Sequence, residues 1–195
     1  MTMSDKPDYL TIQLESQEQW EGWLADNHAS SDGVWLQFFK KGSGKKSITY
    51  AEAVEEALCY GWIDGQSKSY NDESWLQKFT PRRARSVWSK VNRERVERLI
   101  DAGKMKPAGL AQIEAAKLDG RWERAYDAPS TSAVPEDFLH ELAKDEKAKA
   151  FFETLNKSNI YAITYRLQTA KKPETREKRM KAILDMLAKG EKFHP

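Results

Sequence analysis

Two neighbouring segments, Leu-Cys-Tyr-Gly-Trp-Ile-Asp-Gly-Gln (58–66) and Phe-Thr-Pro-Arg-Arg-Ala-Arg-Ser-Val-Trp-Ser-Lys-Val-Asn (79–92), combine aromatic rings, one carboxylate, turn residues and three arginines. Gly61 can end a preceding helix in the left-handed conformation, and Gly65 allows a tight turn or the close approach of a ligand. Asp64 lies between them. We interpret Asp64 first as a turn or cap residue, because Asp beside Gly is common in turns, and alternatively as a carboxylate that faces a cleft.

The second segment is basic. Pro81 fixes the backbone just before three arginines, Arg82, Arg83 and Arg85. In an extended chain the first arginine would face away from the other two. Ser86 or Ser89 fits the N-cap of a helix that runs to Ile100. A basic loop that enters a helix N-terminus predicts an anion site. The alternative is a solvated basic face that pairs with the acidic N-terminal segment.

These features predict a cleft for a small anionic or polar ligand, or for part of a nucleic acid. Arginine offers forked donors to phosphate or carboxylate, and tryptophan offers a stacking face. The expected ligand-binding residues are Trp62, Asp64, Gln66, Arg82, Arg83, Arg85, Ser86, Trp88 and Asn92. In a second hypothesis the protein is an enzyme in which Asp64 acts as general acid or base and the arginines orient an anionic substrate.

Neither a metal nor a cofactor is expected. The three histidines, at 28, 140 and 194, are far apart in the sequence and accompany no Cys or acidic ligand pattern. There is no G-x-S-x-G motif and no dinucleotide glycine fingerprint. Cys59 lies on a predicted helix with no His nearby in sequence, so we interpret it as a packing residue rather than a nucleophile.

Composition indicates a globular protein of 195 residues with 39% hydrophobic and 32% charged residues and a net charge of +2. Residues 1–35 carry seven acidic residues and one lysine, whereas residues 78–98 carry eight Lys/Arg and two Asp/Glu. One cysteine fits a reducing compartment. The first ten residues show neither a basic n-region nor an apolar h-region, and no apolar run could span a bilayer. We therefore expect a cytoplasmic protein.

The periodicity of the first half predicts an α+β fold with a small antiparallel or mixed sheet. Strands are expected at 10–14, 34–39, 62–66 and 74–80, with a loop at 67–73. Ser16 is the expected N-cap of a helix that ends near Asn27, and Thr49 to Glu52 matches a capping box whose helix ends at Gly61. The Gly/Lys stretch 40–46 could cradle a phosphate but lacks P-loop spacing, so we expect a plain flexible connection.

The sequence of the second half of the chain predicts helices. One covers residues 107–118, Pro135 fits N1 of a helix through Lys144, a short helix holds 151–155, Ser158 caps another, and Pro173 begins the last. The Pro/Ser/Thr cluster at 128–134 predicts a linker. The expected division is therefore an α/β domain over 1–127, a linker over 128–134 and a helical domain over 135–195. The basic helix at 171–181 could dock a protein partner, although a solvated helix face is the more ordinary reading.

Several segments together resemble the bacteriocin-protection family, also called YdeI/OmpD-associated. They are residues 47–65, 79–83, 86–92, Gly-Lys-Met (103–105) and Ala-Lys-Lys-Pro-Glu-Thr-Arg-Glu-Lys-Arg (170–179). The resemblance covers about residues 30 to 192 and implies an OmpD-associated helical domain in the last third. It also implies a front part like the small α/β units grouped with YjbR and frataxin-like folds. The family name implies a stress role with an envelope partner, but no catalytic residues accompany it.

Overall fold

The computed structural model describes residues 9–195, so the expected absence of a signal peptide rests mainly on residues outside the described part. The chain forms two compact units. The α/β unit contains the residues up to Ser86 together with Glu94–Gly120, and the helical unit contains Val87–Arg93 and Arg121–Pro195.

The α/β unit is built on a four-stranded mixed sheet in the order β1-β2-β4-β3. The strands are β1 (Thr11–Gln13), β2 (Val34–Phe39), β3 (Trp62–Ser69) and β4 (Ser74–Pro81). β1 runs parallel to β2, and the other two pairs are antiparallel. The prediction of an α+β fold with a small mixed sheet is confirmed.

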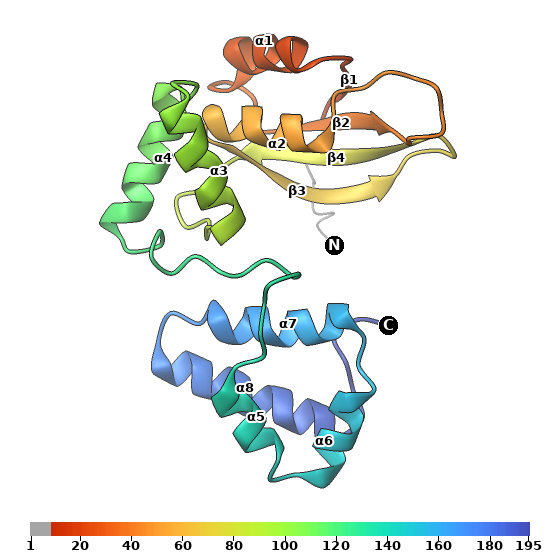
Figure 1. Cartoon of the computed structure of the whole chain (residues 1–195), viewed down its shortest axis with the longest axis vertical. Helices are drawn as coiled ribbons and strands as arrows, with labels where there is room; N and C mark the ends of the chain where they lie inside the picture. The colour runs from red at the N-terminus through yellow and green to blue at the C-terminus, as the bar shows by residue number, and fades with distance from the viewer. Residues whose placement is uncertain (1–8) are drawn as a thin grey trace, which may run out of the picture. The chain divides into compact units, whose positions relative to one another are not determined.

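Helices α1 (Gln17–Asn27) and α2 (Tyr50–Cys59) cover one face of this sheet (Figure 1). The Ser16 side chain caps α1, and Thr49 with Glu52 forms the predicted capping box of α2. Gly61 ends α2 with φ +75°, and a Cβ there would lie 2.9 Å from the Ala108 carbonyl oxygen. Both the left-handed backbone and the close approach of α4 (Pro107–Leu118) therefore require glycine at this position.

The core of the α/β unit is aromatic. Trp20 and Phe79 are 0% exposed, and their ring centroids lie 5.5 Å apart. Inward residues alternate along β2, as expected for a strand with one covered face: Val34, Leu36 and Phe38. Large rings bury much apolar area per residue, so this unit depends on its tryptophans for stability.

The loop predicted at 67–73 is wrong for its first three residues, because β3 continues to Ser69. Asp64 lies within this strand, so its interpretation as a turn residue is also wrong. The pairing of β3 with β4 shifts in register between Asp64 and Ser67. The extension is polar and exposed. Lys68 places its ammonium group 4.3 Å from the centre of the Trp35 ring on β2.

The helical unit contains α5 (Glu136–Leu142), α6 (Glu146–Glu153), α7 (Lys157–Gln168) and α8 (Pro173–Ala188). Its buried core is small: Phe138, Leu142, Ala148, Ile163, Leu167, Ile183 and Leu187. Pro135 is the N-cap of α5 rather than N1, and this helix ends at Leu142 rather than Lys144. Asn156, not Ser158, caps α7, because its side chain accepts the Asn159 N–H.

Helix α3 (Lys90–Asp101) begins after Ser89, whose Oγ accepts the Asn92 N–H at 3.2 Å. Ser89 is therefore the cap, and Ser86 is not. The stretch 128–134 contains a turn in which the Ser132 N–H donates to the Ala128 carbonyl at 2.8 Å. It lies inside the stretch Arg121–Pro195 of the helical unit, so a domain boundary within 128–134 stays a prediction.

Across residues 9–195, no helix combines the length and the apolar character that crossing a membrane requires.

Candidate functional site

The arginine segment is a hydrogen-bonded turn at the end of β4. The N–H of Arg82 donates to the Gly61 carbonyl at 2.9 Å, and Arg82 is only 6% exposed. The chain then turns: the Ser86 N–H donates to the Arg83 carbonyl, and the Arg83 N–H donates to Ser86 Oγ. Arg83 and Arg85 are exposed. The segment is thus extended only as far as Arg83, and its exposed cations sit on a tight turn.

The two tryptophans expected to offer stacking faces are buried, each 1% exposed. Trp62 donates its indole N–H to the His28 carbonyl at 3.1 Å. Trp88 packs edge-on against Trp122 with ring centroids 5.1 Å apart. Trp88 and Asn92 belong to the helical unit, whereas the other seven expected residues belong to the α/β unit. Ligand binding by these nine residues stays a prediction, but neither tryptophan presents a free ring face in this structure.

Asp64 contacts side chains other than those of the arginine segment. Its carboxylate accepts a hydrogen bond from the Tyr50 hydroxyl at 2.6 Å, and Tyr50 begins α2. The Tyr50 ring centroid lies 6.1 Å from that of Trp75 and 6.3 Å from that of Phe38. Phe38 and Trp75 are cross-strand partners with stacked rings 4.7 Å apart. Gln66 stands apart from this aromatic group and accepts from the Lys78 ammonium at 3.4 Å.

A cavity of about 370 Å³ opens beside this aromatic group, and we call it the lysine-loop pocket. It is lined by residues 38–41 and 44–50 together with Trp75. The loop is tied at both ends: the Lys40 N–H donates to the Glu73 carbonyl at 2.8 Å, and the Phe39 N–H donates to Ser47 Oγ at 3.1 Å. The expected plain connection therefore forms one wall of a cavity.

The lysines of this loop are not equally engaged. Lys45 forms an ion pair with Glu73 at 2.6 Å, and Lys40 donates its ammonium hydrogen to the Asp72 carbonyl at 2.9 Å. The side chains of Lys41 and Lys46 are exposed and have no partner within the described part of the chain. The pocket thus has two unmatched cations beside an aromatic wall.

A second polar pocket, of about 340 Å³, lies between α1, α2 and the segment after α3. Glu56 is 6% exposed there, and burial raises the pKa of its carboxyl group. Gln17 donates to it at 2.8 Å, while Lys106 pairs with Glu21 at 2.9 Å. Burial also raises the pKa of the nearby Cys59 thiol to about 12, which fits its interpretation as a packing residue.

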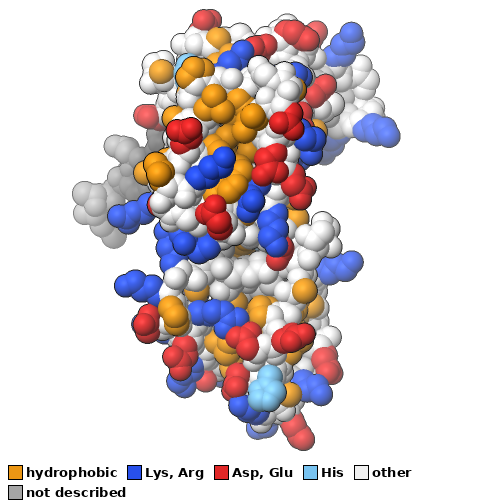
Figure 2. Space-filling model, turned by 60° about the vertical axis from the view of Figure 1, so that its left-hand side comes forward, with side chains coloured by type: hydrophobic (Ala, Val, Ile, Leu, Met, Phe, Trp, Pro, Cys, Tyr) orange, Lys and Arg blue, Asp and Glu red, His pale blue; other side chains and the backbone are white. Residues whose placement is uncertain are grey.

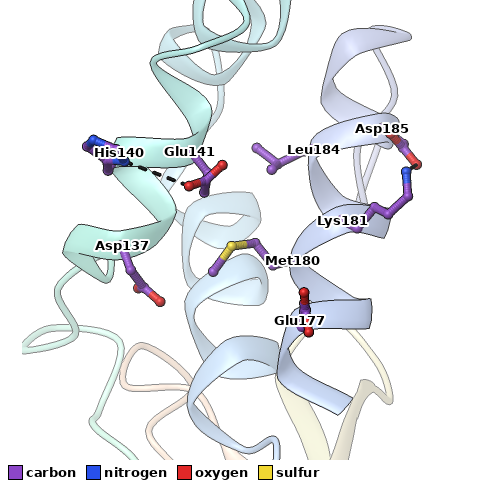
Figure 3. A pocket seen from close by; sticks show the side chains of 8 residues that line it. All are labelled: Asp137, His140, Glu141, Glu177, Met180, Lys181, Leu184 and Asp185. Carbon is purple, nitrogen blue, oxygen red and sulfur yellow. Dashed lines mark ion pairs between the residues drawn. The ribbon is translucent and has the colours of Figure 1, made fainter. Parts of the chain in front are cut away.

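The helical unit has a groove of about 770 Å³ between α5 and α8 (Figure 3). Met180 and Leu184 extend from α8 toward α5 and form its apolar floor. Most of its carboxylates already have cationic neighbours: Asp137 pairs with Arg176, Glu141 with Lys144, and Asp185 with Lys181. The groove therefore carries little net charge to select a ligand, despite its size.

No group of three or more His, Cys, Asp or Glu side chains within residues 9–195 could hold a metal ion. On the face shown in Figure 2, basic and acidic side chains are interspersed. Selection of an anion on such a surface depends on local hollows rather than on one large basic patch.

Comparison with known families divides the chain in two. Residues 12–112 match a family described only as a domain of unknown function, DUF8412. Residues 131–190 match the family described as Bacteriocin-protection, YdeI or OmpD-Associated, OmdA. No curated protein matches the chain, and no solved structure does so.

The resemblance to the OmdA family is confirmed for the helical part, which includes the motif at 170–179. The motifs at 47–65, 79–83, 86–92 and 103–105 lie instead within the other match. That match covers more than half of the 195 residues. The chain thus belongs to the DUF8412 family of unknown function, with an OmdA-type domain at residues 131–190.

Proposed function

We propose that the chain is a binding module whose α/β unit holds a small anionic ligand with a flat ring in the lysine-loop pocket. The observation that carries this proposal is the pair of unmatched ammonium groups, Lys41 and Lys46, beside the Tyr50–Trp75 aromatic wall. Cations supply charge-assisted hydrogen bonds to phosphate or carboxylate, and the aromatic side chains supply a surface against which a ring can pack.

The size of the pocket supports a small molecule. Its volume of about 370 Å³ falls in the range of pockets that bind metabolite-sized ligands. Thr49 and Tyr50 also bring the start of α2 to the pocket, where the helix dipole favours an anion. Glu52 already bonds the Thr49 N–H at 2.9 Å, so the lysines rather than the helix end are the main source of attraction.

An enzyme that uses Asp64 as general acid or base is the second candidate. It is favoured by the short hydrogen bond of 2.6 Å between the Tyr50 hydroxyl and the Asp64 carboxylate, beside the same aromatic wall. Asp64→Asn separates the two candidates. In a binding module this change alters affinity alone, whereas in an enzyme it abolishes turnover while binding survives.

The biological setting that we propose follows the name of the OmdA family: a role in bacteriocin protection or a related stress response, exerted by binding. A protein partner on the basic segment 171–181 and a cytoplasmic location remain part of this proposal. Fractionation of cells that express the tagged protein tests the location.

Isothermal titration tests the binding proposal, with adenosine triphosphate, inorganic phosphate and adenosine as separate probes. The triphosphate carries both charge and ring, so it should bind more tightly than either of the other two. Each charge-assisted contact contributes about 1.5–3 kcal/mol, so Lys41→Glu with Lys46→Glu should weaken triphosphate binding by about a hundredfold or more.

The matched control reverses two exposed lysines of α6, Lys147→Glu with Lys149→Glu, and should keep wild-type affinity. Equal losses of triphosphate affinity in both double variants would show that the effect comes from overall charge. Triphosphate that binds wild type no better than phosphate, or not at all, would contradict the proposal.

A further inference from the structure

Two adjoining hollows run along α7 in the helical unit, with volumes of about 660 and 500 Å³. Tyr165 and Arg166 line both of them, so the hollows form one continuous surface. We call this surface the α7 face, and its main side chains are Lys157, Tyr161, Tyr165, Arg166, Arg179 and Phe193. It is unrelated to the lysine-loop pocket, which belongs to the α/β unit.

Every Lys, Arg, Asp or Glu that lines the α7 face is a cation: Lys157, Arg166 and Arg179. Backbone carbonyls, not carboxylates, hold the two guanidinium groups. Arg166 donates to the Ala162 carbonyl at 3.1 Å, and Arg179 donates to the Arg166 carbonyl at 2.7 Å. A carbonyl fixes the position of a guanidinium group without neutralising it. The face therefore presents fixed positive charge, unlike the groove between α5 and α8.

Aromatic rings alternate with these cations. Tyr161 and Tyr165 are half-buried with ring centroids 6.0 Å apart, and Tyr126 packs edge-on against Tyr165 at 4.9 Å. The Arg166 guanidinium lies 3.7 Å from the centre of the Phe193 ring. The surface thus combines rings and stacked guanidinium planes, which are the two kinds of group that bind unpaired bases.

The C-terminal segment is held against α7 by a buried amide. Asn159 is 1% exposed, donates to the His194 carbonyl at 3.3 Å and accepts the His194 N–H at 3.0 Å. This pair of bonds fixes the backbone next to Phe193, which stacks on Arg166. The face is consequently preorganised, and little side-chain entropy remains to be lost when a ligand binds.

We propose that the α7 face binds single-stranded nucleic acid. From Lys157 to Thr169 the helix rises about 18 Å at 1.5 Å per residue, so cations and rings recur over a length that a single mononucleotide cannot span. A strand supplies phosphates to the cations and bases to the half-buried rings. A duplex does not fit equally well, because its bases are already stacked on one another.

Fluorescence anisotropy of the full chain tests the proposal, with fluorescein-labelled 12-nucleotide oligo-dT and oligo-U as probes. Thymidine monophosphate and a 12-base-pair duplex serve as competitors. Three phosphate contacts predict a slope of log K against log salt of about −2, hence about a twentyfold loss of affinity between 50 and 200 mM KCl. The single strands should bind most tightly, followed by the duplex and then the mononucleotide.

Lys157→Glu and Arg166→Gln should each weaken oligo-dT binding about tenfold, and Arg166→Gln should flatten the salt slope by about 0.7. Lys149→Glu on the exposed side of α6 makes the same charge change as Lys157→Glu and should bind within twofold of wild type. Melting curves test whether each variant is folded. Lys157 is exposed, so Lys157→Glu should stay folded even if Arg166→Gln does not.

Lys41→Glu with Lys46→Glu should bind oligo-dT normally, which separates this proposal from the one for the α/β unit. The proposal is overturned by three results: no anisotropy change at 50 mM KCl, competition by thymidine monophosphate at the same concentration as the strand, or an equal loss in Lys149→Glu.

Discussion

The two units differ in how far their aromatic residues form the main core. In the α/β unit Trp20, Trp62 and Phe79 are at most 1% exposed and form the core between the sheet and its helices. The helical unit also buries Trp88 and Trp122, but the core among its helices α5 to α8 is mainly aliphatic. Tyr161 and Tyr165 stay half-buried on a face that also carries cations. A tryptophan beside arginines in the sequence is therefore no evidence of a stacking site until its burial is known.

Within the α/β unit, burial also distinguishes aromatic residues that only support the fold from those that a ligand can contact. Trp62 donates its indole N–H to the main chain and meets Trp23 edge-on at 5.7 Å, so its ring is enclosed by its own unit. Tyr50 and Trp75 lie at the margin of the same core, where the Lys40–Lys46 loop leaves a cavity. Function in the α/β unit is thus expected at the edge of the core, and in the helical unit on the surface of one helix.

The largest effect should follow from breaking the aromatic core of the α/β unit. Trp20→Ala removes a fully buried ring and the hydrogen bond from its indole N–H to the Ala53 carbonyl at 3.0 Å. We expect the free energy of unfolding to fall by about 3–5 kcal/mol. Urea denaturation followed by circular dichroism measures this loss. Leu118→Ala is the control, because Leu118 is 90% exposed and its loss should cost less than about 0.5 kcal/mol.

A smaller effect should follow from releasing the C-terminal segment from α7. Asn159→Ala removes the bonds to His194 and to Asn156 Oδ1. The partners are exposed and can bond water instead, so each lost hydrogen bond should cost about 0.5–1.5 kcal/mol. We also expect faster carboxypeptidase digestion and weaker oligo-dT binding, because Phe193 is no longer held beside Arg166. Digestion at the wild-type rate would show that the segment is held by other contacts.

The polar pocket of the α/β unit supplies a prediction about pH. Burial raises the pKa of Glu56, so the folded state holds this proton more tightly than the unfolded state. The stability that Glu56 contributes is therefore fully present below the ordinary pKa of Glu and is lost as pH rises through the raised pKa. Glu56→Gln keeps an acceptor for Gln17 but cannot ionise, so it should melt at a higher temperature than wild type at pH 8 and should lose this pH dependence.

Glu18→Gln is the matched control, because a hydrogen bond from Ser16 lowers the pKa of Glu18. Its stabilising contribution is present above the ordinary pKa and is lost as pH falls, so removing its charge should lower the melting temperature slightly at pH 8. Melting curves of both variants from pH 4 to 8 should therefore move in opposite directions. Parallel shifts would indicate a general charge effect instead of burial at Glu56.

Much of the fold could be predicted from local signals. The strand at 34–39 and the helix at 107–118 match the structure, because alternation and the Pro at the helix start act within each segment. The end of β3 at Ser69 could not be predicted, since it depends on pairing with β4 after a register shift between Asp64 and Ser67. The lysine-loop pocket was equally hidden, because packing joins residues 40–46 to Tyr50 and Trp75.

The smallest expected effect decides between two clusters of cations in the α/β unit. Arg83 and Arg85 are exposed on the turn after β4, but neither lines the lysine-loop pocket. If that pocket holds the ligand, Arg83→Ala with Arg85→Ala should change adenosine triphosphate affinity by less than about twofold, which is about 0.4 kcal/mol.

If the arginine turn is the anion site instead, losing one charge-assisted contact costs about 1.5–3 kcal/mol, or one to two decades in affinity. Titrating this variant beside Lys41→Glu with Lys46→Glu therefore locates the anion. A large loss in the arginine variant alone would return the site to the segment 82–86 and leave the lysine loop as a connection.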